Sequence, residues 1–157
     1  MGESRDQAAA PLDEVGWTLL EALQRDGRLS YTELARLVGL SGPAVADRVR
    51  RLEAAGLITG YRAEVDRARL GFRFWAFVRI RAFPGRDAAI EAHAAATPEV
   101  VECHEVTGED SYVLKVGATT VQHLDRVITA LAPFGATQST LLLSTKIAGK
   151  PVRRPGS

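Results

Sequence analysis

One stretch of the sequence combines small side chains with a cluster of positive charge. Ser41-Gly-Pro-Ala44 places four small residues in succession, and three arginines follow closely. If this stretch is a helix, its narrow first turn can approach base edges in the major groove of DNA, and its guanidinium groups can meet phosphates. A plain helical bundle whose arginines form a solvated surface remains an alternative. The residues that we predict to contact duplex DNA are Ser30, Tyr31, Ser41, Gly42, Pro43, Ala44, Asp47, Arg48, Arg50 and Arg51.

Cys103 and His104 could suggest a metal site or a catalytic nucleophile. Adjacent residues on a strand point to opposite faces, so these two side chains cannot hold one ion or one substrate together. Cys103 is also the only cysteine, which excludes an intramolecular disulfide and a zinc site built from several thiolates. We therefore expect no metal, no cofactor and no catalytic residue, and we expect Cys103 to be a small buried hydrophobe. For His104, a structural role, a place near the effector and a place at an interface all remain open.

Three helices are predicted in the first part of the chain. Apolar residues recur at helical spacing, and Ser30 and Glu33 form a capping box, in which each side chain satisfies a backbone N–H group of the other. A short extended stretch over 57–65, with a turn-prone glycine, then predicts a small β wing. The helices are expected from Leu12 to the Asp26-Gly27 stop, from the Ser30 cap to Gly39, and from the Ser41 cap to about Ala55.

From residue 72 the apolar period changes to two, which is typical of strands. The first of these strands carries aromatic residues on both faces, with Trp75 and Phe77 on the second face. We therefore expect another copy of the sheet to cover that face. The order βαββαβ is that of a ferredoxin-like unit. Strands are expected over 72–83, 100–107, 112–117 and 137–147, and helices over 86–96 and after Thr119 or Thr120.

The composition bounds the class of protein. The chain has 157 residues, 46% of them hydrophobic, and a formal net charge of +1, so it is neither disordered nor membrane-like. Because we find no bilayer-spanning apolar run and no signal-peptide pattern, we expect no membrane partner and a cytoplasmic location. Residues 74–145 carry five basic and eight acidic residues, whereas the first half and the tail concentrate basic residues that could meet a polyanion.

Five segments of the sequence form a recognisable set. They are Leu12-Asp-Glu-Val, Leu29-Ser-Tyr-Thr-Glu-Leu-Ala-Arg-Leu-Val-Gly-Leu-Ser, Arg48-Val-Arg-Arg-Leu-Glu53, Gly56-Leu-Ile-Thr-Gly-Tyr61 and Glu102-Cys-His-Glu-Val-Thr-Gly108. Together they resemble the Lrp/AsnC, or feast/famine, family of transcription regulators over about residues 12–148. The resemblance implies an α+β chain with a winged helix-turn-helix domain at 12–60, a linker at 61–71, a ferredoxin-like effector and dimerisation domain at 72–148, and flexible tails at 1–11 and 149–157.

The resemblance also implies partners. These are double-stranded DNA, a small-molecule effector such as an amino acid, and further copies of the chain, which form homodimers that assemble into tetramers or octamers. Two other functions remain open at this point. One is a sirohaem-decarboxylase-like enzyme, because such enzymes resemble the same family, and the other is an architectural, nucleoid-associated protein without an effector.

The glycine-containing turn before Tyr112 is the candidate effector site. Backbone N–H groups of such a turn can hold a carboxylate, and nearby acids can receive an α-ammonium group, which are the two demands of a free amino acid. The family's second acidic position is occupied here by Ser111, with an acid at Asp110 instead. A turn whose acids only aid solubility remains the alternative. The residues that would share the site between subunits are Thr107, Gly108, Glu109, Asp110, Ser111, Thr137, Ser139 and Thr140.

Overall fold

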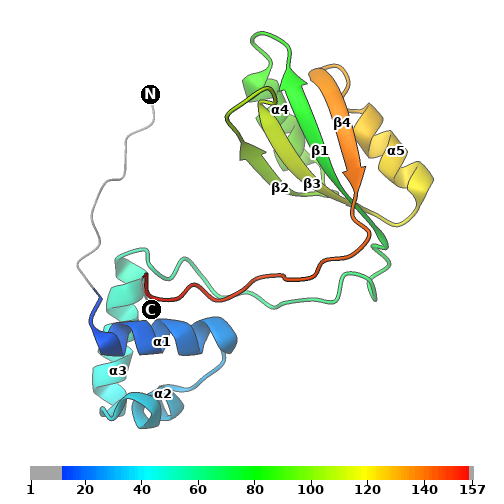
Figure 1. The fold of residues 1–157 in the computed structure, drawn as a ribbon. Coiled ribbons are helices and arrows are strands. Elements are labelled where there is room, and N and C mark those ends of the chain that lie inside the picture. Colours follow the sequence, from blue (N-terminus) through cyan, green and yellow to red (C-terminus); the bar gives the residue numbers. More distant parts are fainter. Residues whose placement is uncertain (1–11, 156–157) are drawn as a thin grey trace. The chain divides into compact units, whose positions relative to one another are not determined.

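The computed structural model describes residues 12–155, which fold as two compact units (Figure 1). One unit contains residues 12–64 together with the C-terminal segment 147–155, and the other contains residues 65–146. The first unit is helical and the second holds a sheet with two helices, which confirms the α+β class predicted from the sequence. Within residues 12–155, no helix is long and apolar enough to cross a membrane.

The helical unit is built from three helices around a small apolar core. Each helix begins at a side chain that accepts a hydrogen bond from a first-turn N–H, a group that the helix itself leaves free. Gly39 ends the second helix with a φ of 68°, in the left-handed region that favours glycine. Leu19, Leu34, Val45 and Val49 are at most 1% exposed and form the centre of the core. The helices are α1 (Glu14–Arg25), α2 (Tyr31–Val38) and α3 (Gly42–Ala54).

The segment predicted as a β wing contains no strand. Residues 57–65 pair with no other segment of the described chain. The backbone instead turns back at the end of α3, where the N–H groups of Leu57 and Ile58 donate to the Leu52 carbonyl at 3.0 and 3.2 Å. A two-stranded ribbon is marginally stable by itself, which explains why a short extended stretch is not sufficient to form one.

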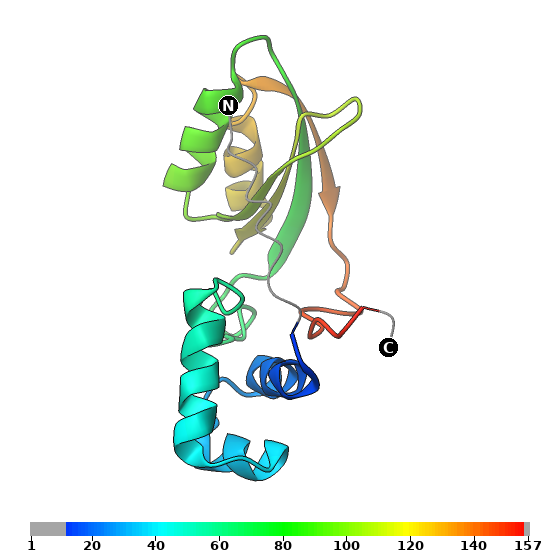
Figure 2. The same cartoon turned by 90° about the vertical axis from the view of Figure 1, so that its left-hand side faces the viewer.

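The sheet unit has the predicted βαββαβ order. Its strands are antiparallel neighbours in the order β2-β3-β1-β4, so β1 and β3 are central and β2 and β4 are edges. Both helices lie on one face of the sheet (Figure 2). The elements are β1 (Phe74–Ala82), α4 (Asp87–Ala96), β2 (Val100–Glu105), β3 (Tyr112–Ala118), α5 (Val121–Thr129) and β4 (Gly135–Leu141).

One face of the sheet is covered by the two helices, and the other face is more exposed. Ala76, Val78 and Ile80 of β1 are at most 1% exposed and contribute to the core on the helix side. The alternate residues of β1 point to the other face, where Phe77 is 39% exposed. This face, which we call the open face, carries Trp75, Phe77, Arg79 and Arg81 of β1.

The last strand is shorter than predicted. The apolar residues up to Ile147 predicted a strand over 137–147, but β4 begins at Gly135 and ends at Leu141. Leu143 is 93% exposed and Ile147 is 66% exposed, so the chain has left the sheet before these residues. The apolar residues after Leu141 therefore led to a predicted strand that is too long at this end.

Candidate functional site

Side-chain caps fix the start of α2, next to the predicted DNA contacts Ser30 and Tyr31. The Ser30 N–H donates to Glu33 Oε2 at 2.8 Å, and the Glu33 N–H donates to Ser30 Oγ at 3.2 Å, which is the predicted capping box. Hydrogen bonds from the Ser30 hydroxyl and N–H hold the pKa of Glu33 below its usual range. Ser30 thus positions α2, while Tyr31 beside it is 45% exposed.

The front of α3 is narrow and open. Ser41 caps the helix by accepting the Ala44 N–H at 3.4 Å, and Pro43 occupies the first turn. A Cβ added at Gly42 would meet no atom within 4 Å, and both Pro43 and Ala44 are exposed. The first turn holds no acidic residue, so its N–H groups and the positive end of the helix dipole favour an anion such as a phosphate.

Arg48 is engaged within the protein rather than free. Its Nη1 donates to both carboxylate oxygens of Asp13, at 2.7 and 3.0 Å, and its side chain is 34% exposed. Asp13 is also the N-cap of α1 and accepts the Gly16 N–H at 2.8 Å. The Gly16 hydrogen bond and the Arg48 guanidinium together lower the pKa of Asp13. Arg48 therefore ties α3 to the start of α1, and a separation of 35 residues concealed this pair from pattern analysis.

The other two arginines of α3 differ in their partners. Arg51 Nη2 lies 2.6 Å from Asp47 Oδ2, one helical turn earlier. The sequence could have revealed this pair, because residues four apart are neighbours on a helix. Arg50 donates from Nε to the Ala46 carbonyl at 3.2 Å and has no carboxylate partner within residues 12–155. Arg50 therefore carries the uncompensated positive charge of this face.

The Thr107–Ser111 turn joins β2 to β3 beside the end of β1. The Ser111 N–H donates to the Ile80 carbonyl at 2.8 Å, and its hydroxyl accepts the Ala82 N–H at 3.2 Å. Gly108 has a φ of 120°, which a residue with a side chain rarely adopts. Ser111 therefore fastens the turn to β1, so its hydroxyl already has a partner.

Both carboxylates of this turn face arginines of the open face. Arg81 Nη2 donates to the Glu109 carboxylate at 2.8 Å, and Arg81 Nε donates to the Glu109 carbonyl at 3.2 Å. Arg79 Nε lies 3.8 Å from Asp110 Oδ2 and is buried without a hydrogen-bond partner. A free amino acid carries a carboxylate and an ammonium group, so it matches the two kinds of charge found here.

The three β4 residues of the predicted effector site do not share one face. Thr137 and Ser139 lie on the helix side with Ile80, whereas Thr140 pairs with Phe77 on the open face. Side chains alternate along a strand, and the sequence analysis grouped these neighbours without allowing for that alternation. Thr137 is level with the turn, because both Thr137 and Ser111 are paired with Ile80.

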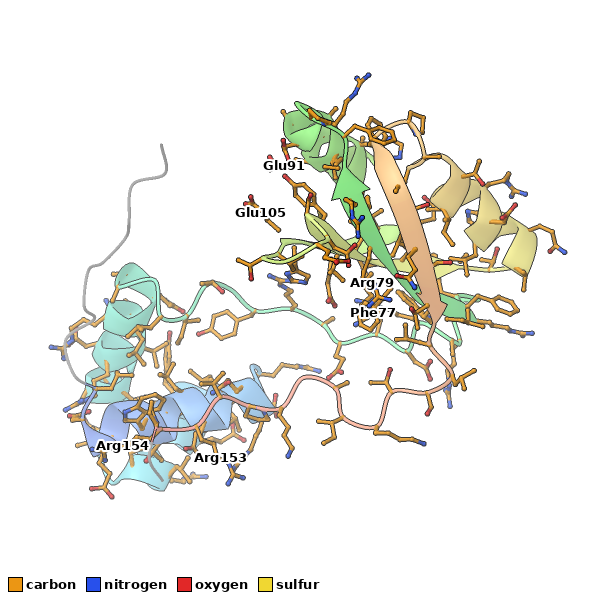
Figure 3. All side chains as sticks on the ribbon, turned by 45° about the horizontal axis from the view of Figure 1, so that its top comes forward. Phe77, Arg79, Glu91, Glu105, Arg153 and Arg154 are labelled. Carbon is orange, nitrogen blue, oxygen red and sulfur yellow. The ribbon has the colours of Figure 1, made fainter. Side chains whose placement is uncertain are left out.

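The open face combines aromatic and charged groups. Figure 3 shows Phe77 and Arg79 of β1 close together. The Trp75 ring lies so close to Gly117 on β3 that a Cβ there would come within 2.5 Å of it. On β2, His104 is exposed and its Nε2 lies 3.5 Å from Glu102. His104 therefore belongs to the open face rather than to the core.

Cys103 is exposed, so the prediction that it is buried is wrong. The reason is that β2 is an edge strand, so within residues 12–155 only β3 pairs with it. Cys103 lines a hollow of 330 Å³ with Glu91 and Glu105, which Figure 3 labels. Partial burial and the Glu91 charge raise the pKa of its thiol. Among the described residues, no group of three His, Cys, Asp or Glu side chains could hold a metal ion.

Comparisons with known proteins cover both units. Residues 12–53 match the AsnC-type helix-turn-helix domain, and residues 75–152 match the Lrp/AsnC ligand binding domain. The chain is 38% identical over 134 residues to the uncharacterized HTH-type transcriptional regulator YezC of Bacillus subtilis, covering 85% of this chain and 95% of that protein.

Two solved structures show the same architecture. The structure of B. subtilis LrpC superposes with a TM-score of 0.85 at 30% identity, covering 90% of this chain and 100% of that one. The feast or famine regulatory protein from M. tuberculosis, complexed with L-methionine, superposes with a TM-score of 0.82 at 35% identity, covering 88% and 96%.

Proposed function

The chain belongs to the Lrp/AsnC family of transcriptional regulators, and we propose that its helical unit reads DNA while its sheet unit senses an amino acid and pairs subunits. The matched relatives are named as regulators, and their names give no support to the sirohaem-decarboxylase alternative. We assign DNA binding to residues 12–64 with 147–155, and effector binding to residues 65–146.

The observation that carries DNA recognition is the open front of α3. Gly42, Pro43 and Ala44 leave room for base edges, and Arg50 supplies positive charge without a carboxylate partner in the described chain. Arg48 offers less positive charge to this face, because its guanidinium is paired with the Asp13 carboxylate. Two such helices in one dimer would match half-sites about one or a few turns of DNA apart.

The DNA proposal is tested by placing one negative charge at either end of α3. Ala44→Glu sets a carboxylate at the front of the helix and should weaken binding to duplex DNA by about tenfold or more, since it would face phosphates. Ala54→Glu is the control, because it adds the same charge at the other exposed end of the helix. Fluorescence anisotropy titrations measure both. Equal losses for the two variants would contradict the proposed interface.

The effector proposal is supported by the charge pairs of the turn. An amino acid could replace one partner in each pair, with its carboxylate on Arg81 or Arg79 and its ammonium group on Glu109 or Asp110. The complex of the M. tuberculosis relative with L-methionine supports an amino acid as the ligand class. Binding between subunits would then alter how dimers associate, and with it which DNA sites they occupy together.

A thermal-shift screen with the twenty amino acids tests the effector proposal. We expect at least one of them at millimolar concentration to raise the melting temperature, because a ligand that binds the folded state stabilises it. Arg81→Ala should abolish the response. Arg126→Ala should leave it intact, because Arg126 is an exposed residue of α5 away from the turn. A response to none of the twenty would instead favour the architectural alternative.

We further propose that the open face of the sheet pairs with a second copy, and that dimers assemble into tetramers or octamers. The exposed Phe77 ring beside the Arg79 guanidinium is an apolar and polar combination typical of protein interfaces. Light scattering tests this assignment. Phe77→Lys should reduce the particle mass, whereas Val121→Lys, at a residue of α5 that is 54% exposed, should not. An unchanged mass for Phe77→Lys would contradict it.

A further inference from the structure

The C-terminal segment 147–155 returns to the helical unit and is held there by one side chain. Gln24 Oε1 accepts the Val152 N–H at 2.7 Å, and Gln24 Nε2 donates to the Val152 carbonyl at 3.0 Å. One carboxamide thus pairs with both backbone polar groups of one residue, as a neighbouring strand would. The two residues lie 128 positions apart in the sequence, so this contact joins the C-terminal end of the described chain to α1.

Other residues of the C-terminal segment also lie along α1. Val152 borders a hollow of 380 Å³ whose apolar lining includes Leu20 and Leu23. Farther along the segment, Arg154 lines a second hollow together with Glu14 and Glu21 of α1. Figure 3 shows Arg153 and Arg154 beside this helix. The segment therefore follows the helix over more than one contact.

We propose that residues 142–152 form a second tether between β4 and α1, with Gln24 as the group that locks it. The first tether is the continuous chain from α3 to β1, residues 55–73. The second spans Leu141 to Val152, and even a fully extended chain of that length reaches only about 40 Å. With the lock closed, two tethers restrict the orientations that the units can adopt, and with it open only one does.

The lock can open at low cost. Both hydrogen bonds are exposed to water, and Val152 is 67% exposed. Exposed hydrogen bonds contribute little net free energy, because water offers replacement partners. The open and closed states are therefore close in free energy, within the range that ligand or DNA binding can shift. Gln24 acts as a positioning residue, since it touches neither of the proposed ligand sites.

The consequence for DNA binding rests on the proposed function. A dimer that must place two recognition helices on two half-sites benefits from units with restricted orientations, because less freedom is lost on binding. Binding to a single half-site involves one helical unit and gains nothing from the restriction. Opening the lock should therefore weaken binding to paired half-sites selectively.

Limited trypsin digestion tests the lock itself. Trypsin does not readily cleave before proline, which follows both Lys150 and Arg154. The trypsin site within the C-terminal segment 147–155 is therefore the Arg153–Arg154 bond. Gln24→Met keeps a strong helix former of similar length but removes both hydrogen bonds, and it should speed cleavage after Arg153 about two- to threefold. Val152→Pro removes the donated N–H without touching α1 and should act in the same direction. Gln122→Met, on α5, is the control and should change nothing.

An unchanged cleavage rate in both Gln24→Met and Val152→Pro would overturn the lock. The functional arm compares Gln24→Met with the natural chain on DNA selected by the natural chain, as a paired and as a single half-site. We expect a loss of several-fold on the paired site and none on the single site. No loss, or equal losses on both, would overturn the second tether. A natural chain that binds no DNA would contradict the proposed function, and the digestion would still decide whether the lock exists.

Discussion

The two candidate sites of this protein differ in how many of their arginines are paired with carboxylates. On the α3 face, Asp13 and Asp47 pair with two of three arginines and leave Arg50 over. At the β2–β3 turn, two arginines face two carboxylates, so the charges match. The first surface keeps positive charge for a polyanion, while the second offers matched pairs that a zwitterion could enter. The number of arginines in a motif therefore overstates the charge available for binding, because the fold decides which of them are paired.

The largest effect should come from breaking one unit and leaving the other folded. Leu34→Ala removes a buried side chain from the helical core of seven residues, whereas the sheet core has twelve. The cost should be about 2–5 kcal/mol, a large fraction of the stability expected of a small unit. Each unit contains one tryptophan, Trp17 or Trp75, whose fluorescence reports its unfolding.

The measurement is thermal unfolding in Trp75→Phe and Trp17→Phe backgrounds. Leu34→Ala should lower the Trp17 transition and leave the Trp75 transition in place. Leu114→Ala, in the sheet core, should lower the temperature of the Trp75 transition more than that of the Trp17 transition. Transitions that move together in both variants would show that the two units unfold as one.

A smaller effect should separate the arginines of α3. Arg50→Ala should weaken binding to duplex DNA and reduce the slope of log affinity against log salt by about one, since one phosphate contact is lost. Arg51→Ala should have less effect, because its partner Asp47 already neutralises it. Titrations at several salt concentrations compare the two. A larger slope change for Arg51→Ala would reverse the assignment of charge on this face.

Asp13→Asn sharpens the same comparison. Asn is as good an N-cap as Asp, so α1 should keep its start, while the negative charge opposite Arg48 is removed. We expect DNA binding at low salt to tighten by about two- to fivefold, because Arg48 then adds its charge to the face. Weaker binding would mean that Arg48 must be held by a carboxylate to position α3.

The smallest expected effect is a difference in acid sensitivity. The helical unit holds two carboxyl groups with lowered pKa values, Asp13 and Glu33, whereas Glu102, held by Lys115, is such a group in the sheet unit. A carboxyl group whose pKa is lower in the folded than in the unfolded state stabilises the fold at a pH above its unfolded pKa. This contribution is lost as the pH falls through the folded-state pKa. The Trp17 transition should therefore decline more steeply than the Trp75 transition below about pH 4. Asp13→Asn should reduce that decline.

Local chemistry made most of the fold predictable from the sequence. The Ser30 and Glu33 capping box, the Gly39 stop and the alternation along β1 each depend on residues close in sequence, and the structure confirms them. The predictions of a β wing and of a strand that continues to residue 147 were wrong, because a strand needs a partner and apolar residues alone do not supply one.

The candidate sites were less predictable, since their partners are distant. The pairing of Asp13 with Arg48, and of Gln24 with Val152, joins residues whose separation in sequence leaves no periodic signal. The exposure of Cys103 likewise depends on which strand forms the edge of the sheet, a property of topology rather than of local pattern. The candidate surfaces stay predictions from the sequence, and the structure adds which of their charged groups are paired.

Selection from a random pool of DNA duplexes by the full chain tests the central claim most directly, namely that the front of α3 reads DNA. We predict an enriched motif with two related halves about one or a few helical turns apart, and no such enrichment by the Ala44→Glu variant. Binding that enriches no sequence, or the same motif enriched equally by Ala44→Glu, would contradict the account.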